Sequence, residues 1–152
     1  MSRYFAYGSN MSRALMERRC RNAVAVGAAR LDGWRFIVTR DGFASVVPAA
    51  GAAVHGVLWQ VSPRDLAALN AYESLDSGLY VRRVLPVRSG ERVIPALVYV
   101  GRDRTPGQPR PGYQRVVVEA AREWQLPDTY VRSLERWGAP FGARAVEAGE
   151  IG

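Results

Sequence analysis

Glu73 is the residue whose position in this sequence most clearly predicts chemistry. The helix expected before it turns Leu66 and Leu69 inward, and helical spacing places Glu73 on the same stripe. Burial and the negative end of the helix dipole both raise the pKa of such a carboxyl toward neutral pH, where it can exchange protons. Two interpretations are equally supported by the pattern: proton transfer by Glu73, or a structural ion pair with Arg82 or Arg83.

A second candidate is the turn Gly8-Ser9-Asn10, which follows an expected strand over residues 3–7 and precedes an expected helix. Backbone N–H groups at such a strand-to-helix turn suit a carboxylate, a phosphate or an oxyanion. Taken alone, the turn is better explained as a simple connection, because short turns of this composition are common. No phosphate-binding GxxxxGK[ST] pattern is present in the sequence.

The remaining reactive side chains predict structural roles. His55 lies on an apolar face of an expected strand, and Cys20 is expected to be a small buried hydrophobe. Ser9 lacks a nucleophile elbow, and Asp76 lies in a segment typical of a turn. One cysteine and one histidine do not make a conventional zinc site, so we do not expect one.

Length and composition favour one globular domain. The chain has 152 residues, of which 48% are hydrophobic and 23% charged, with a formal net charge of +7. All 21 basic residues are arginine and they are dispersed, which favours a solvated basic surface over a nucleic-acid interface. The sequence shows neither a membrane-spanning apolar run nor a secretory signal pattern, so we expect a cytoplasmic protein without a membrane partner.

The elements that must position these residues are short strands and helices in an α+β arrangement, a small mixed sheet or barrel with flanking helices. Seven strands are expected, over residues 3–7, 24–30, 34–40, 43–48, 54–61, 79–87 and 91–100. Four helices are expected, over residues 12–20, 62–73, 113–124 and 128–137. Asp41-Gly42 predicts a two-residue hairpin turn. The predicted domain covers residues 1–137, and residues 138–152 form a loose tail.

Several spaced segments together resemble the γ-glutamylcyclotransferase family. The first is Tyr4-Phe5-Ala6-Tyr7-Gly8-Ser9-Asn10, which is similar to the signature of that family. The others are Ala29-Arg30-Leu31 with Trp34, His55-Gly56-Val57-Leu58-Trp59, Glu73 to Tyr80, Pro111-Gly112-Tyr113, Ala120-Ala121, and Leu126-Pro127 with Tyr130. The resemblance extends from about Arg3 to Leu134, and the combination is much more specific than the first segment alone.

This resemblance implies an enzyme that cyclises the γ-glutamyl group of a small molecule to 5-oxoproline and releases an amine, with no cofactor. It implies that Glu73 is the general acid/base. The substrate-holding residues implied by the same comparison are Tyr4, Phe5, Ala6, Tyr7, Gly8, Ser9, Asn10, Tyr80 and Tyr113. Intramolecular ring closure depends on positioning more than on a protein nucleophile, which agrees with the absence of a Ser/His or Cys/His pattern.

The sequence departs from the family pattern at two positions. Ser74 stands where glycine usually follows the glutamate, and His55 stands where an aromatic residue is common. Three alternatives therefore stay open: a general γ-glutamyl amino acid substrate, a γ-glutamyl amine of a specific pathway, or a binding module without turnover. An arginine-rich nucleic-acid binder is a further, less favoured form of the last alternative.

Overall fold

The structure, a computed structural model, describes residues 1–72 and 78–138. Within them five strands form a closed barrel in the order β1-β3-β2-β4-β5. Their bounds are β1 Ser2–Ala6, β2 Val24–Val38, β3 Ala44–Val61, β4 Tyr80–Ser89 and β5 Arg92–Gly101. Most pairs are antiparallel, but β1 and β5 run parallel, so the predicted mixed barrel with flanking helices is confirmed.

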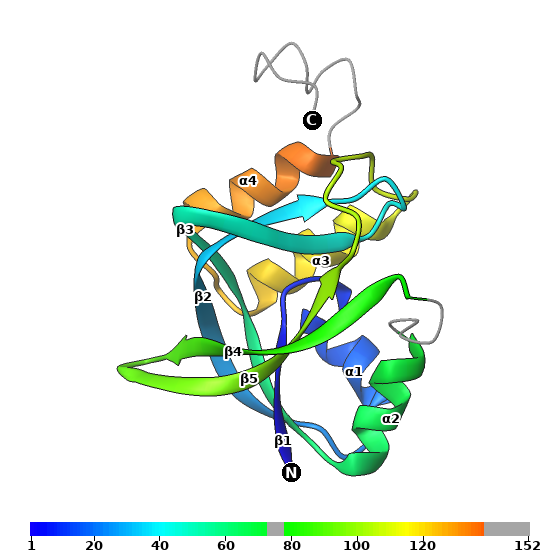
Figure 1. The fold of residues 1–152 in the computed structure, drawn as a ribbon, viewed down its shortest axis with the longest axis vertical. Coiled ribbons are helices and arrows are strands. Elements are labelled where there is room, and N and C mark those ends of the chain that lie inside the picture. The colour runs from blue at the N-terminus through cyan, green and yellow to red at the C-terminus, as the bar shows by residue number, and fades with distance from the viewer. Residues whose placement is uncertain (73–77, 139–152) are drawn as a thin grey trace.

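The strand number expected from the sequence was wrong, because pairs of predicted strands form continuous ones. Asp32-Gly33 does not turn the chain: the pairing register shifts between Asp32 and Trp34, and β2 continues through this irregularity. Residues 43–48 and 54–61 likewise both belong to β3. As a result, β2 and β3 pair as one long two-stranded ribbon, which curves over one end of the barrel (Figure 1).

The β2–β3 hairpin forms as predicted, but its turn is longer than two residues. The Thr39 N–H donates to the Phe43 carbonyl at 3.0 Å, and the Gly42 N–H donates to the Thr39 carbonyl at 2.9 Å. Gly42 has a φ of +88°, which closes a three-residue turn of the kind that places glycine in the left-handed region.

The helices begin close to where the sequence predicts, and the first two do so because their first turns carry capping side chains. They are α1 Arg13–Arg19, α2 Pro63–Tyr72, α3 Tyr113–Glu123 and α4 Asp128–Gly138, with a short 3-10 helix, η1, over Ser9–Met11. The Leu15 N–H donates to Ser12 Oγ at 3.3 Å. Ser62 and Asp65 form a reciprocal capping box, with both hydrogen bonds at 3.1 Å.

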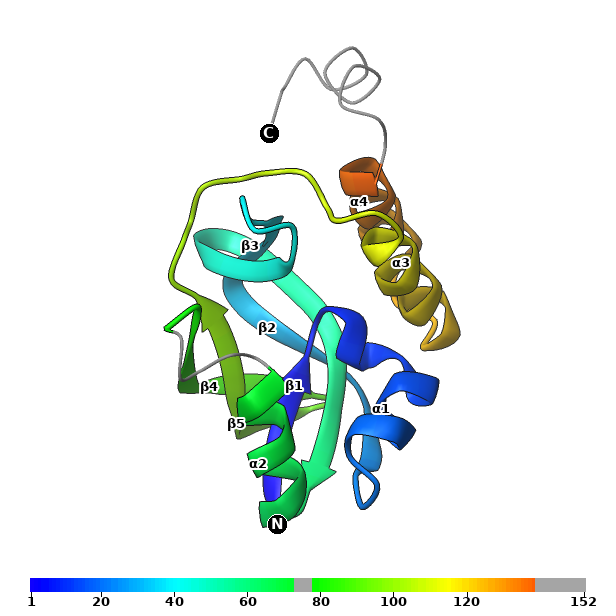
Figure 2. The ribbon, with the colours of Figure 1, turned by 90° about the vertical axis from the view of Figure 1, so that its right-hand side faces the viewer.

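The four helices lie at two places around the barrel. Figure 2 shows α3 and α4 side by side against one side of it, whereas α1 and α2 lie at the end that holds the N-terminus. No helix in the described ranges is both long and apolar enough to cross a membrane.

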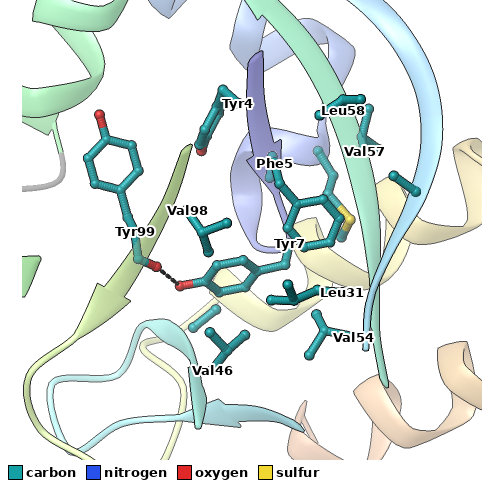
Figure 3. Packing of buried hydrophobic residues seen from close by; sticks show 14 of the residues in the cluster. Tyr4, Phe5, Tyr7, Leu31, Val46, Val54, Val57, Leu58, Val98 and Tyr99 are labelled. Atoms are coloured by element: carbon teal, nitrogen blue, oxygen red, sulfur yellow. Dashed lines mark hydrogen bonds between the residues drawn. The ribbon is translucent and has the colours of Figure 1, made fainter. Parts of the chain in front are cut away.

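Aromatic and β-branched side chains from every strand fill the barrel. Phe5, Val57 and Leu58 are fully buried where β1 pairs with β3, and they lie together in Figure 3. Because side chains alternate along a strand, Tyr4 and Phe5 of β1 point in different directions in this view. The N-terminal strand is thus fixed in the core and places the turn that follows it.

Candidate functional site

A cavity of about 260 Å³ opens where β1 ends and η1 begins. This volume suits a small metabolite better than a drug-sized ligand, whose sites start at about 300 Å³. Its walls come from segments far apart in the sequence. Among the described residues, it is lined by Tyr4, Tyr7, Gly8, Ser9, Asn10, Phe43, Ala44, Tyr72, Leu79, Tyr80, Tyr99 and Tyr113.

The turn between β1 and α1 forms one wall of the cavity. The first helical hydrogen bond of η1 runs from the Met11 N–H to the Gly8 carbonyl at 3.1 Å. The N–H groups of Ser9 and Asn10 precede this bond and so have no partner within the helix. The sequence prediction that this turn presents backbone N–H groups at the start of a helix therefore agrees with the geometry.

Gly8 allows Tyr113 to approach this turn closely. A Cβ atom added at Gly8 would lie 2.8 Å from the Tyr113 hydroxyl oxygen and 3.2 Å from Ala44 Cβ. Any other residue would displace the tyrosine or the turn, because non-bonded carbon atoms normally lie about 3.5–4.0 Å from their neighbours. The glycine is required here for space.

The backbone of Ala44 orients two of the lining tyrosines. Its N–H donates to the Tyr113 hydroxyl oxygen at 3.2 Å, and its carbonyl accepts from the Tyr80 hydroxyl at 2.7 Å. Tyr113 also packs edge-to-face against Phe43, with ring centroids 5.4 Å apart. The start of β3 therefore joins α3 and β4 at the wall of the cavity.

The hydroxyls of three further tyrosines connect β1, β5, η1 and α2 by hydrogen bonds. The Tyr7 hydroxyl donates to the Tyr99 carbonyl, as Figure 3 shows. The Tyr99 hydroxyl donates to Asn70 Oδ1 of α2 at 2.6 Å. Tyr4 accepts from Asn10 Nδ2 at 3.0 Å, and its ring packs edge-to-face against Tyr99. The cavity wall is consequently a rigid polar and aromatic frame.

The structure brings together most of the substrate-holding residues expected from the sequence. Those that line the cavity are Tyr4, Tyr7, Gly8, Ser9, Asn10, Tyr80 and Tyr113. Phe5 and Ala6 are instead buried in the core and are not among the lining residues. Asn70 of α2 contacts one of the other lining residues, Tyr99, through a side-chain hydrogen bond.

Glu73, Ser74 and Asp76 lie outside the described residues, as does the tail from residue 139 onward. Tyr72 immediately precedes Glu73 in the chain and Leu79 follows the segment 73–78, and both line the cavity. Of the arginines considered as structural partners for Glu73, Arg82 donates to Asn70 Oδ1 at 3.2 Å. Arg83 lies over the Trp34 ring at 5.5 Å.

Sequence reasoning missed five lining residues, Phe43, Ala44, Tyr72, Leu79 and Tyr99. Two of them carried a usable signal. Tyr72 directly precedes the candidate glutamate, and Tyr99 is a polar aromatic residue in an otherwise aliphatic strand. Ala44 carried none, because it contributes through its backbone.

Cys20 and His55 lie away from the cavity. Cys20 is buried, and burial followed by the Asp65 charge raises the pKa of its thiol to about 11, so it is an inert hydrophobic residue as predicted. The His55 ring packs against Tyr130 with centroids 4.8 Å apart. Burial, and then the Arg30 charge, lower the pKa of His55. This environment agrees with the structural role expected from the sequence.

Comparisons with known proteins give one consistent family. The family model described as "Gamma-glutamyl cyclotransferase, AIG2-like" matches residues 4–126. A gamma-glutamylcyclotransferase of Mus musculus is 28% identical over 143 residues, covering 87% of this chain and 76% of that protein. The protein of the same name from Bos taurus is 29% identical over 142 residues, covering 86% and 76%.

A solved structure named "Gamma-glutamyl cyclotransferase" superposes with a TM-score of 0.82 at 26% sequence identity. The superposition covers 88% of this chain and 86% of the solved one. The chain therefore belongs to the gamma-glutamyl cyclotransferase, AIG2-like family and is an enzyme of the γ-glutamylcyclotransferase type.

Proposed function

We propose that this enzyme converts a γ-glutamyl amino acid or γ-glutamyl amine into 5-oxoproline and the free amine, with Glu73 as general acid/base. The observation that carries the proposal is the cavity itself. Its walls combine the Gly8–Asn10 turn with Tyr72, the residue that directly precedes Glu73 in the chain. Family membership supports the reaction type.

The reaction needs one proton acceptor that later becomes a donor. Glu73 takes a proton from the α-ammonium group of the substrate, and the freed amine attacks the γ-carbonyl carbon. A carbon–nitrogen bond forms and closes the five-membered ring. The attacking nitrogen gives up its second surplus proton as the original amide bond breaks. The departing nitrogen takes up this proton and the one held by Glu73, so the amine leaves as an ammonium ion and the ring keeps a neutral amide N–H. Atoms and charge balance without a cofactor.

The cavity wall supplies the positioning that this ring closure requires. The N–H groups of Gly8 and Ser9 hold the substrate carboxylate or the developing oxyanion, as helix N-termini and preorganised donors do elsewhere. Tyr80 and Tyr113, both hydrogen-bonded to the backbone of Ala44, line the same cavity. The amine and the γ-carbonyl already belong to one molecule, and holding the substrate folded brings them together, which lowers the entropic cost of ring closure.

The test of this proposal is Glu73→Gln, which keeps the size of the side chain and removes its ability to exchange a proton. General acid–base groups contribute roughly 10²- to 10⁴-fold, so 5-oxoproline release should fall by about that factor. Thermal denaturation of the variant provides the control for folding. A folded variant that retains full activity contradicts the role of Glu73.

The leaving amine is tested separately, with γ-glutamyl amino acids, glutathione and γ-glutamyl amines assayed side by side. We expect at least one of these classes to yield 5-oxoproline with wild-type enzyme. A preference for amines over amino acids supports the alternative of a pathway-specific enzyme. Absence of release from all three classes contradicts the proposed reaction.

A further inference from the structure

Arg19 joins two parts of the cavity wall although it is not among the residues that line it. It lies in the last turn of α1 and is half-buried. Its Nη1 donates to Ser9 Oγ at 3.3 Å and also to Asn10 Oδ1. Its guanidinium carbon lies 3.7 Å from the centroid of the Tyr72 ring. One side chain therefore contacts both the Gly8–Asn10 turn and the last residue of α2.

Only arginine can make this set of contacts. Its planar guanidinium donates hydrogen bonds along the edge while its face stacks on an aromatic ring. Hydrogen bonds from a charged donor are stronger than neutral ones, and partial burial reduces their screening by solvent. The contacts with Ser9, Asn10 and Tyr72 thus use both the edge and the face of one group.

The same contacts fix the orientation of the Asn10 amide. Asn10 Oδ1 accepts from Arg19, which leaves Nδ2 to donate to the Tyr4 hydroxyl oxygen at 3.0 Å. Tyr4 lines the cavity. Without Arg19 the Asn10 amide loses its charged partner and can turn over, so the effect of Arg19 extends to the Tyr4 wall.

The neighbouring arginines of α1 differ from Arg19. Arg18 is exposed, and Arg13 lies over the Trp124 ring, on the side of the helix that faces α3. A general basic surface would not distinguish these positions. Arg19 is distinguished from Arg13 and Arg18 by its polar contacts with two cavity-lining residues of the turn.

We infer that Arg19 is a positioning residue of the active site, which holds the Gly8–Asn10 turn and the Tyr72 end of α2 in one arrangement. Its influence on turnover rests on the proposed function, since Glu73 follows Tyr72 in the chain. Its influence on the Gly8–Asn10 turn is independent of the proposed function. The effect on turnover and the effect on the turn can therefore be measured separately.

The activity test compares Arg19→Gln with Arg18→Gln, which removes the same charge from the same helix. Loss of charge-assisted contacts should lower kcat/KM for a γ-glutamyl amino acid roughly 10- to 100-fold in Arg19→Gln. Arg18→Gln should remain within about twofold of wild type. Equal activities of these two variants overturn the inference.

Arg19→Lys separates the two contacts. A lysine can still donate to the turn but cannot stack a planar face on Tyr72. In Arg19→Lys we expect KM to be closer to the wild-type value than in Arg19→Gln, whereas kcat stays below that of wild type. A purely structural role for Arg19 would lower thermal stability without this split, and that result would overturn the inference.

A double-variant cycle tests the link to Tyr72. Tyr72→Leu removes the ring on which Arg19 stacks, so its effect on kcat should be smaller in the Arg19→Gln background than in wild type. Fully additive losses would contradict the coupling.

Amide hydrogen exchange tests the turn without reference to activity. The Met11 and Ser12 N–H groups close η1 by hydrogen bonds of 3.1 and 3.0 Å. Their exchange should accelerate in Arg19→Gln but not in Arg18→Gln. Unchanged exchange overturns the positioning role, whereas a wild-type enzyme that releases no 5-oxoproline contradicts only the proposed function.

Discussion

Two regions of this molecule bury aromatic rings with polar atoms, and they treat those atoms differently. At the cavity, the hydroxyls of Tyr80 and Tyr113 are both engaged by the backbone of Ala44. Where α4 meets β3, His55 packs against Tyr130 through ring contact. Within the described ranges the buried Tyr130 hydroxyl has no hydrogen bond of ordinary geometry, although the His55 backbone lies near it.

This difference indicates that the orientation of the tyrosine hydroxyls matters at the cavity and not at the contact between α4 and the barrel. Unsatisfied buried polar atoms cost stability, so hydroxyls held at defined angles are typical of sites whose geometry is used. The contact between α4 and the barrel needs only to exclude water and fill space. The cavity wall must instead hold several tyrosines in one arrangement.

Among the substitutions that test this comparison, the largest effect is expected for Gly8→Ala, which alters the cavity side. The added methyl group would lie 2.8 Å from the Tyr113 hydroxyl oxygen, so the turn or the tyrosine must move. Misplacement by about 1 Å can cost roughly 10²-fold in rate, and we expect kcat/KM to fall by about that factor.

Adding Tyr113→Phe to Gly8→Ala provides the control for this clash. Removal of the hydroxyl relieves the closest contact, so the double variant should have a higher Tm than Gly8→Ala alone. Equal melting temperatures would show that the close approach of Gly8 and Tyr113 is not what requires glycine.

A smaller effect is expected from a matched pair of substitutions, Tyr80→Phe and Tyr130→Phe, each of which removes one hydroxyl. Tyr80→Phe loses the hydrogen bond to the Ala44 carbonyl, which should lower the free energy of unfolding by about 1 kcal/mol and reduce kcat/KM. Tyr130→Phe removes a buried hydroxyl without such a bond, so it should not lower stability and should leave activity unchanged.

Denaturant unfolding and steady-state assays of these two variants check the comparison directly. Similar losses of stability for both would contradict the distinction between the cavity wall and the α4 contact.

The smallest effect concerns the pH dependence contributed by His55. Burial lowers the pKa of His55 below its ordinary value of 6.5, so the unfolded chain takes up the proton more readily. The contribution to stability is complete above pH 6.5 and is lost as the pH falls through the lowered pKa.

In His55→Gln this part of the pH dependence should disappear. Unfolding midpoints of wild type and variant, compared between about pH 7 and pH 5, measure it. If the two proteins lose stability in parallel over this range, the pKa of His55 is not shifted by folding.

The starts of α1 and α2 could be predicted from local sequence because capping is a local interaction. Ser12 and Ser62 each bond to a backbone N–H three residues later, and Asp65 completes a capping box. Strand continuity was harder to predict, because Asp32-Gly33 is compatible with a turn or with an irregular strand. Pairing with β3 decides between them.

The chain's residue pattern alone determined the α+β class, the approximate helix starts and the family resemblance. Each depends on neighbours in sequence or on a spaced motif. Tertiary structure alone decided which side chains meet around the cavity: Tyr7 reaches Tyr99 across 92 positions, and Ala44 reaches Tyr113 across 69. Such contacts arise when the barrel closes, because strand register and packing, rather than local preference, set which distant backbone atoms become partners.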